Sequence, residues 1–83
     1  MIVAAAIRQD GVTYRLDPPA RHGDIIHWMV EDGHVPAPVA GTQGFIDDIE
    51  GFVERERAAE IAKAGGQVER LISPPELYSE DLW

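Results

Sequence analysis

The sequence contains no cysteine, and its 83 residues include no long run of apolar side chains. Without cysteine, neither a disulfide nor a thiolate-bound metal can stabilise the fold. No stretch approaches the roughly 18 apolar residues of a membrane-spanning helix. The apolar start, residues 2–7, is followed at once by Arg8 and by Asp10-Gly11, which is unlike a signal peptide. We therefore expect a cytoplasmic protein that does not bind a membrane.

Basic residues are also few, with seven against 15 acidic ones and a net charge of −8. Such a chain repels polymeric nucleic acid, which is itself a polyanion. All the basic residues except Lys63 are arginines. Arginine binds phosphate or carboxylate with a planar fork of N–H groups. A compositional bias of a GC-rich genome would also explain the ratio, so only the position of each arginine can decide between these origins.

The length of the chain indicates one domain, residues 1–83. A domain of this size buries only about 60–65% of the surface that its unfolded chain exposes. Because disulfides cannot add stability, self-association is the remaining common source of buried area. We therefore expect a homo-oligomer, at least a dimer.

Turn residues divide the chain into two β-hairpins, each followed by a helix. Asp10-Gly11 between two apolar-alternating runs is a strong hairpin signal. Asp17 is placed to cap the first helix, with Pro18 at its first position. The pattern predicts strands at 2–8, 12–16, 43–46 and 52–53, helices at 20–32 and 54–64, a loop at 34–42, a further short strand at 67–72, and an irregular tail from residue 73. The fold class is α+β, an antiparallel sheet with both helices on one face.

A cationic or potentially cationic residue begins the apolar stripe of each predicted helix. At about 100° per residue, His22 falls within the stripe of the first helix and Arg55 within that of the second. An unpaired buried charge is costly, so Arg55 needs a partner. One interpretation is a phosphorylated ligand held by Arg21 and Arg55. The other is an internal ion pair of Arg55 with Asp24 or Glu80, with His22 a core residue bonded to a backbone carbonyl.

Aromatic residues are scarce, and two positions allow two roles each. Phe45 follows Gly44 and either stacks on a base or belongs to the core. The tail carries an apolar-aromatic stripe, so it either packs on its own domain or docks on a second chain. The stripe consists of Leu77, Tyr78, Leu82 and Trp83.

Signals for catalysis are weak. His22 and His27 are five residues apart, which directs them to different sides of a helix and makes a poor metal pair. Ser73 and Ser79 lie in no nucleophile-elbow context. His22 with Asp24 as a base and its orienting carboxylate is the one enzymatic arrangement left, and it would make a small hydrolase. We expect no catalysis, no metal and no cofactor.

Short motifs distributed along the chain carry a family resemblance. They are Arg21-His22-x-Asp24-Ile25-Ile26, Gln43-Gly44-Phe45-Ile46, Phe52-Val53-x-Arg55 with Ala58-x-x-Ile61-Ala62 and Gln67, and Leu77-Tyr78-Ser79-Glu80-Asp81-Leu82-Trp83. In order and spacing they resemble the first-described type of phage Thoeris anti-defence sponge. The resemblance implies a homo-oligomer, a dimer or a hexamer, that sequesters cyclic ADP-ribose isomers without cleaving them, some members also holding cyclic oligonucleotides. It also implies the cytoplasm of a bacterial host.

The same resemblance suggests roles for individual residues. It gives Arg21 a phosphate contact and Phe45 a stacking contact on adenine, while Arg55 matches the arginine of the Phe-Val-x-Arg motif. Arg70 is added as a further basic contact that no motif covers. The candidate ligand-binding residues are Arg21, His22, Asp24, Gln43, Phe45, Arg55, Arg70 and Tyr78. The chain is shorter in its central loops than the family pattern, which leaves the ligand open.

The expected function is therefore non-catalytic sequestration of a cyclic nucleotide immune signal. The alternative is a phage or bacterial protein-interaction module that acts through its acidic surface and aromatic C-terminal tail. A carboxylate partner for Arg55 in its own chain would favour the alternative.

Overall fold

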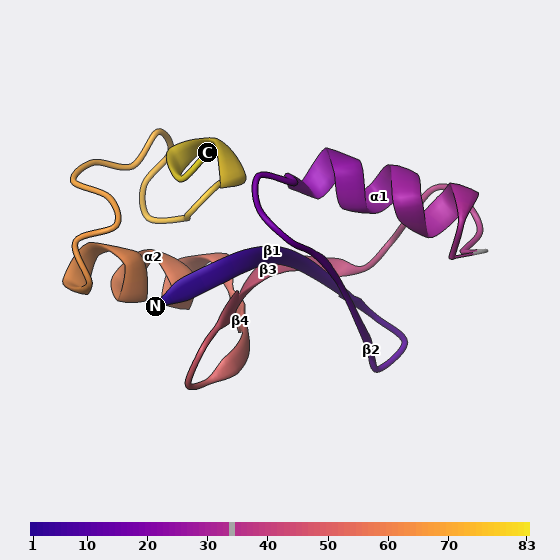
Figure 1. Cartoon of the computed structure of the whole chain (residues 1–83), viewed down its shortest axis with the longest axis horizontal. Coiled ribbons are helices and arrows are strands. Elements are labelled where there is room, and N and C mark those ends of the chain that lie inside the picture. Colours follow the sequence, from indigo (N-terminus) through magenta and orange to yellow (C-terminus); the bar gives the residue numbers. More distant parts are fainter. Residues whose placement is uncertain (34) are drawn as a thin grey trace.

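The structure is a computed structural model that describes residues 1–33 and 35–83. Its elements in chain order are β1 (Ile2–Gln9), β2 (Val12–Leu16), α1 (His22–Glu31), β3 (Thr42–Asp47), β4 (Gly51–Glu54), α2 (Arg55–Ala64) and a short 3₁₀ helix, η1 (Ser79–Asp81). The four strands form one antiparallel sheet in the order β2-β1-β3-β4 (Figure 1). The predicted α+β fold, two hairpins each followed by a helix, is confirmed.

The first hairpin turns at the two residues that the sequence indicates. Asp10 and Gly11 have φ angles of 51° and 77°, the left-handed region that a tight two-residue turn requires. The second hairpin turns within residues 48–50. There the Asp47 carboxylate accepts backbone N–H bonds from Ile49 and Glu50 at 3.0 and 2.8 Å, a side-chain turn typical of aspartate.

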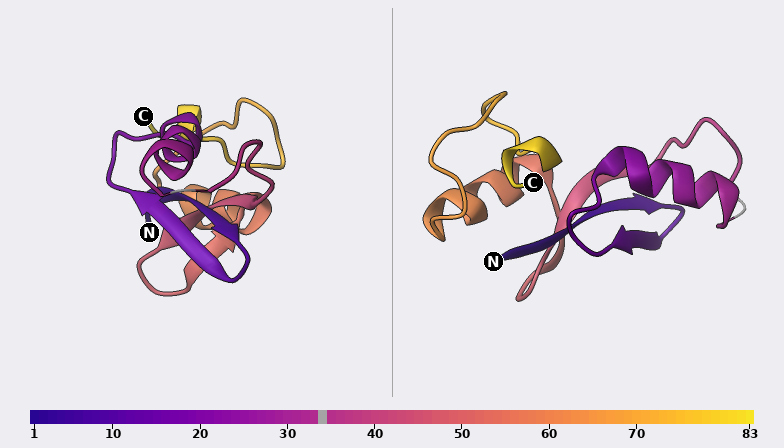
Figure 2. Two further views of the ribbon diagram at one scale, coloured as in Figure 1. Left: turned by 90° about the vertical axis from the view of Figure 1, so that its right-hand side faces the viewer. Right: turned by 45° about the horizontal axis from the view of Figure 1, so that its top comes forward.

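The core lies between one face of the sheet and the two helices. Residues paired across antiparallel strands point to the same face, and Ala5 is paired with Phe45 in β3. Phe45 is fully buried, as are Ile25 and Met29 of α1. The buried side chains that α2 contributes to the core are small, and they let this helix lie close to the sheet: Ala58, Ala59 and Ala62, with the partly buried Ile61 packed against the core. Figure 2 shows α1 and α2 over the two ends of the twisted sheet.

Helix α1 begins later than predicted, and Asp17 does not cap it. The backbone carbonyl of Asp17 instead accepts the N–H of Ala20 at 3.1 Å, closing a turn. The helix begins after Arg21, whose backbone N–H donates to the Asp24 carboxylate at 2.8 Å. A carboxylate in the first turn thus takes over the capping that the sequence assigned to Asp17.

The predicted strand at 67–72 is wrong, because residues 67–72 form bends and irregular structure. The predicted loop at 34–42 is confirmed for residues 35–41, whereas β3 already begins at Thr42. His34 lies outside the described residues.

The aromatic tail packs on its own chain. Leu77 is fully buried, and the Trp83 indole Nε1–H donates to the carbonyl oxygen of Ala20 at 2.9 Å. Arg21 donates from Nε to the main-chain oxygen of Trp83 at 2.5 Å. The tail therefore lies beside the start of α1 and over α2 (Figures 1 and 2), so the first of the two roles proposed for it is confirmed. In the described part of the chain, neither helix has the length and apolar character needed to cross a membrane.

Candidate functional site

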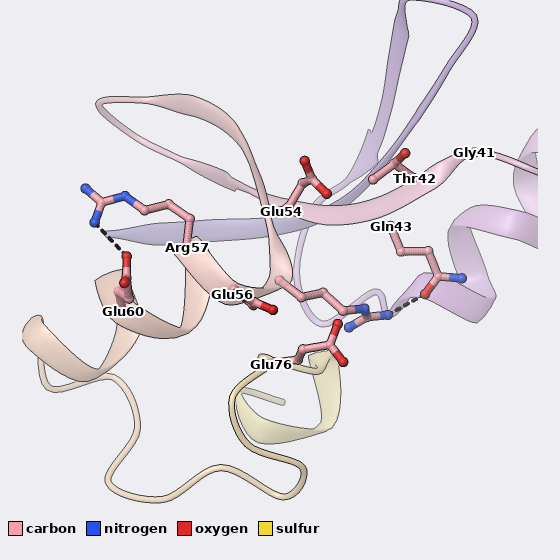
Figure 3. A pocket seen from close by; sticks show the side chains of 9 residues that line it. Gly41, Thr42, Gln43, Glu54, Glu56, Arg57, Glu60 and Glu76 are labelled. Atoms are coloured by element: carbon pink, nitrogen blue, oxygen red, sulfur yellow. Dashed lines mark hydrogen bonds and ion pairs between the residues drawn. The ribbon is translucent and has the colours of Figure 1, made fainter.

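A cleft of about 850 Å³ opens where the start of β3, the junction of β4 with α2, and the tail meet. Figure 3 shows the polar side chains that these segments contribute to its wall, with Arg57 directed toward Glu60, and with Gln43 and Glu76 on the other side of the start of α2. We call it the Arg55 cleft, and its lining residues are Gly41, Thr42, Gln43, Glu54, Arg55, Glu56, Arg57, Glu60 and Glu76.

The position of Arg55 follows from the way β4 continues into α2. The strand ends at Glu54 and the helix begins at Arg55 without a connecting loop. Ala58 and Ala62, three and seven residues further on, are fully buried and fix which side of α2 faces the core. Residues at this spacing share one side of a helix, so Arg55 begins the buried side and is itself half-buried at the edge of the sheet.

The groups that the Arg55 guanidinium contacts directly are neutral. Nη1 donates to the carbonyl oxygen of Leu77 at 2.7 Å, and Nη2 donates to Oε1 of Gln43, the dashed line that ends on Gln43 in Figure 3. The guanidinium carbon lies 4.2 Å from the centre of the Tyr78 ring, a cation–π contact. Among the ion pairs of the described residues, none includes Arg55. The predicted alternative of an ion pair with Asp24 or Glu80 is therefore wrong.

His22 is a core residue, as the second interpretation predicted. It is 6% exposed, and its Nε2 lies 2.7 Å from the carbonyl oxygen of Gly44. Nδ1 lies 2.6 Å from the Ser79 hydroxyl, and the ring packs edge to face on Phe45. Burial lowers the pKa of His22, and the charge of Arg55 lowers it further, against the opposing effect of the Gly44 carbonyl.

Of the candidate ligand-binding residues, the structure brings Gln43, Arg55 and Tyr78 together. The predicted stacking of Phe45 on a base is wrong, because Phe45 has no exposed surface and its ring belongs to the core. Arg21 is exposed and bonded to Trp83, away from the cleft lining.

Arg70 and Asp24 also lie outside the Arg55 cleft. Arg70 is exposed in the segment after α2. The Asp24 carboxylate binds the backbone N–H of Arg21, while the ring of His22 is bonded to Gly44 and Ser79. The base-and-orienter pair of the hydrolase alternative is therefore not formed.

The glutamates of the cleft are the main feature that the sequence did not predict. Glu54 and Glu56 look like ordinary charges at the start of a helix, and Glu76 comes from a distant segment. Arg57 is bonded to Glu60 at 3.1 Å and to Glu50. Only the spacing of Arg55 with the buried alanines of α2 could have indicated that the neighbouring acids line the same cleft. In the part of the chain that the structure describes, no cluster of acidic and histidine side chains has the arrangement of a metal site.

A comparison with known protein families identifies a family for this chain. The family model of the phage T4 y16D protein matches residues 1–83, so the chain belongs to that family. No curated protein and no solved structure matches. The match identifies a phage protein family and does not extend to Thoeris anti-defence.

Proposed function

We propose that this member of the phage T4 y16D protein family binds a cyclic ribonucleotide signal of the bacterial host and holds it intact, with Arg55 as the phosphate contact. The observation that carries the proposal is the Arg55 guanidinium, half-buried on the cleft wall and bonded to neutral acceptors. A guanidinium has five N–H donors, so the bonds to Leu77 and Gln43 leave donors for a ligand. A phosphate would be its first charged partner.

The surroundings of Arg55 favour a preorganised contact. The carbonyl of Leu77, the amide of Gln43 and the ring of Tyr78 each restrict the guanidinium from a different side. A side chain that is already ordered loses less conformational entropy when a ligand arrives. Its planar fork can then bind two phosphate oxygens at once.

The glutamates of the cleft restrict the class of ligand: it must carry hydrogen-bond donors as well as a phosphate. Glu54, Glu56 and Glu76 line the same cleft and would repel a bare anion. Carboxylates accept hydrogen bonds from ribose hydroxyls and from the exocyclic amine of adenine. A ribonucleotide combines both kinds of group. The cleft volume, about 850 Å³, lies within the roughly 300–1,000 Å³ typical of small-molecule sites.

Sequestration lowers the free concentration of a signal by mass action, without any chemical step. The resemblance noted in the sequence suggests cyclic ADP-ribose isomers or cyclic oligonucleotides as that signal. Binding without cleavage agrees with the burial of His22 and Ser79, whose side chains are bonded to each other. A homo-oligomer, dimer or hexamer, stays part of the proposal.

The proposal is tested by calorimetry with cyclic ADP-ribose isomers and with cyclic di- and trinucleotides. We expect heat with at least one of them, and Arg55→Gln should weaken that binding about 10- to 100-fold, the value of a charge-assisted hydrogen bond. Arg70→Gln is the matched control, because it removes an exposed arginine outside the cleft and should leave the affinity unchanged. Absence of heat with every ligand would remove the proposal.

Two measurements separate the alternatives. Chromatography of the ligand after incubation should return it intact, whereas conversion would indicate an enzyme. A pull-down from bacterial lysate tests the interaction module. That module would have to bind through the acidic surface alone. Its tail is already bound to its own chain, with Trp83 bonded to Ala20 and Arg21 and with Leu77 buried in the core.

A further inference from the structure

We infer that His22 and Ser79 are positioning residues for Arg55. Their hydrogen bonds attach residues 77–79 to α1 and β3, and only a neutral His22 imidazole completes these bonds. Acid therefore releases the segment that holds Arg55. We call residues 77–79 the strap. The inference goes beyond the proposed function, since it concerns the unliganded chain and stands whether or not a nucleotide binds.

The three residues of the strap connect the Arg55 guanidinium to the buried ring of His22. The Leu77 N–H donates to the backbone carbonyl of Arg55 at 3.1 Å, and the Leu77 carbonyl accepts the guanidinium at 2.7 Å. The Tyr78 ring stacks on the same guanidinium. The next residue, Ser79, is 1% exposed, and its hydroxyl contacts the ring of His22 at 2.6 Å. Any movement of Ser79 away from His22 therefore moves the residues that hold Arg55.

The partners of His22 fix its protonation state. A carbonyl only accepts hydrogen bonds, so Nε2, 2.7 Å from the Gly44 oxygen, carries the proton. In the neutral ring Nδ1 is then an acceptor, and the Ser79 hydroxyl donates to it. The oxygen of that hydroxyl in turn accepts the backbone N–H of His22 at 3.3 Å. Every hydrogen bond of the network is made in this one state.

Protonation leaves the network incomplete. Nδ1 would then donate to the oxygen of the Ser79 hydroxyl, and the hydroxyl proton would lose its acceptor and have to turn away from the ring inside a buried site. The charged ring would also stay buried, which is costly. Two charged groups of the described residues act on it: Arg55 of α2 opposes a positive ring, and Glu80 of η1 favours it. From β3, the ring faces the Gly44 carbonyl and the Phe45 ring, which carry no charge.

Hydrogen exchange measured by NMR on the unliganded protein tests the inference. The Leu77 amide reports strap opening, because its partner is the Arg55 carbonyl. After correction for intrinsic exchange, its protection should fall as the pH drops below about 6.5, by up to about tenfold per pH unit, until His22 is protonated in the folded state. The pH at which His22 is protonated in the folded chain is measured independently, from the pH titration of its ring protons.

His27→Gln is the matched control, since His27 is an exposed histidine of the same helix and should not affect the dependence. Ser79→Ala should lower Leu77 protection at neutral pH and flatten its dependence on pH. Unchanged Leu77 protection in the wild-type chain across the titration of His22 would overturn the inference. So would loss of the dependence in His27→Gln, or its full retention in a folded Ser79→Ala variant.

Discussion

Gln67 holds both backbone groups of Ile2 with its side chain. Its Oε1 accepts the Ile2 N–H at 2.8 Å, and its Nε2 donates to the Ile2 carbonyl at 2.9 Å. The side-chain amide thus provides the donor and acceptor that a neighbouring strand would provide. It protects the start of β1, next to the end of α2, without any strand being added.

Replacing Gln67 should loosen the start of β1. We expect Gln67→Ala to lower the free energy of unfolding by about 1–3 kcal/mol, because two backbone groups of a buried residue lose their partners together. Urea denaturation followed by circular dichroism measures the change. Glu69→Ala, an exposed position two residues away, should stay within about 0.5 kcal/mol of the wild type. Equal stabilities of the two variants would contradict this role of Gln67.

The same contact shows why local sequence patterns predicted most of the fold and missed this segment. Asp10-Gly11 and the alternation of apolar residues indicate the first hairpin directly, since both act between neighbours along the chain. Residues 67–72 contain apolar residues such as Val68 and Leu71, which favour a strand. However, the Gln67 side chain already makes hydrogen bonds to the backbone of Ile2 in β1, so these residues do not pair with β1 as a further strand. A single side chain that makes the hydrogen bonds of a neighbouring strand produces no periodic pattern in the sequence.

The candidate site was predictable only in part, for a related reason. The spacing of Arg55 with Ala58 and Ala62 indicated a guanidinium on the buried side of a helix. Its partners Gln43 and Leu77 lie 12 residues before it and 22 after it. The sequence could not select such long-range neutral partners over a carboxylate.

Gly44 should be hard to replace. A methyl group there would lie 2.3 Å from the carbonyl oxygen of Val53 and 2.7 Å from the Phe52 ring. Gly44→Ala should therefore cost about 2–3 kcal/mol of unfolding free energy through overpacking. Gly23→Ala is the control, because no atom lies within 4 Å of that position in α1, and alanine favours a helix by about 0.5–1 kcal/mol. The two variants should thus shift the thermal midpoint in opposite directions.

Burial of Leu77 makes the tail part of the cooperative fold. Leu77 has no exposed surface, and truncation of a buried leucine typically costs about 2–5 kcal/mol. We expect Leu77→Ala to fall in that range in urea denaturation. Ile72→Ala should change little, because that side chain is 67% exposed. A Leu77→Ala variant as stable as Ile72→Ala would mean that the tail is not an integral part of the domain.

Asp47 should make the second hairpin sensitive to acid. One carboxylate oxygen accepts the Met1 ammonium at 2.6 Å, and the other accepts the N–H groups of Glu50 and Ile49. The bond from the Met1 ammonium, followed by that from Glu50, lowers the pKa of Asp47 to about 2, against the opposing effect of burial.

Because the folded pKa of Asp47 lies below the unfolded one, its ionised form stabilises the fold. That contribution is complete above the unfolded value, about 3.9, and is lost as the pH falls through about 2. The urea midpoint should therefore fall between pH 4 and pH 2, and it should fall less steeply in Asp47→Asn. Asp48→Asn removes only the exposed contact of Asp48 with Met1 and should retain most of the dependence. If Asp47→Asn followed the wild-type curve in this range, the low pKa of Asp47 would contribute nothing to folding.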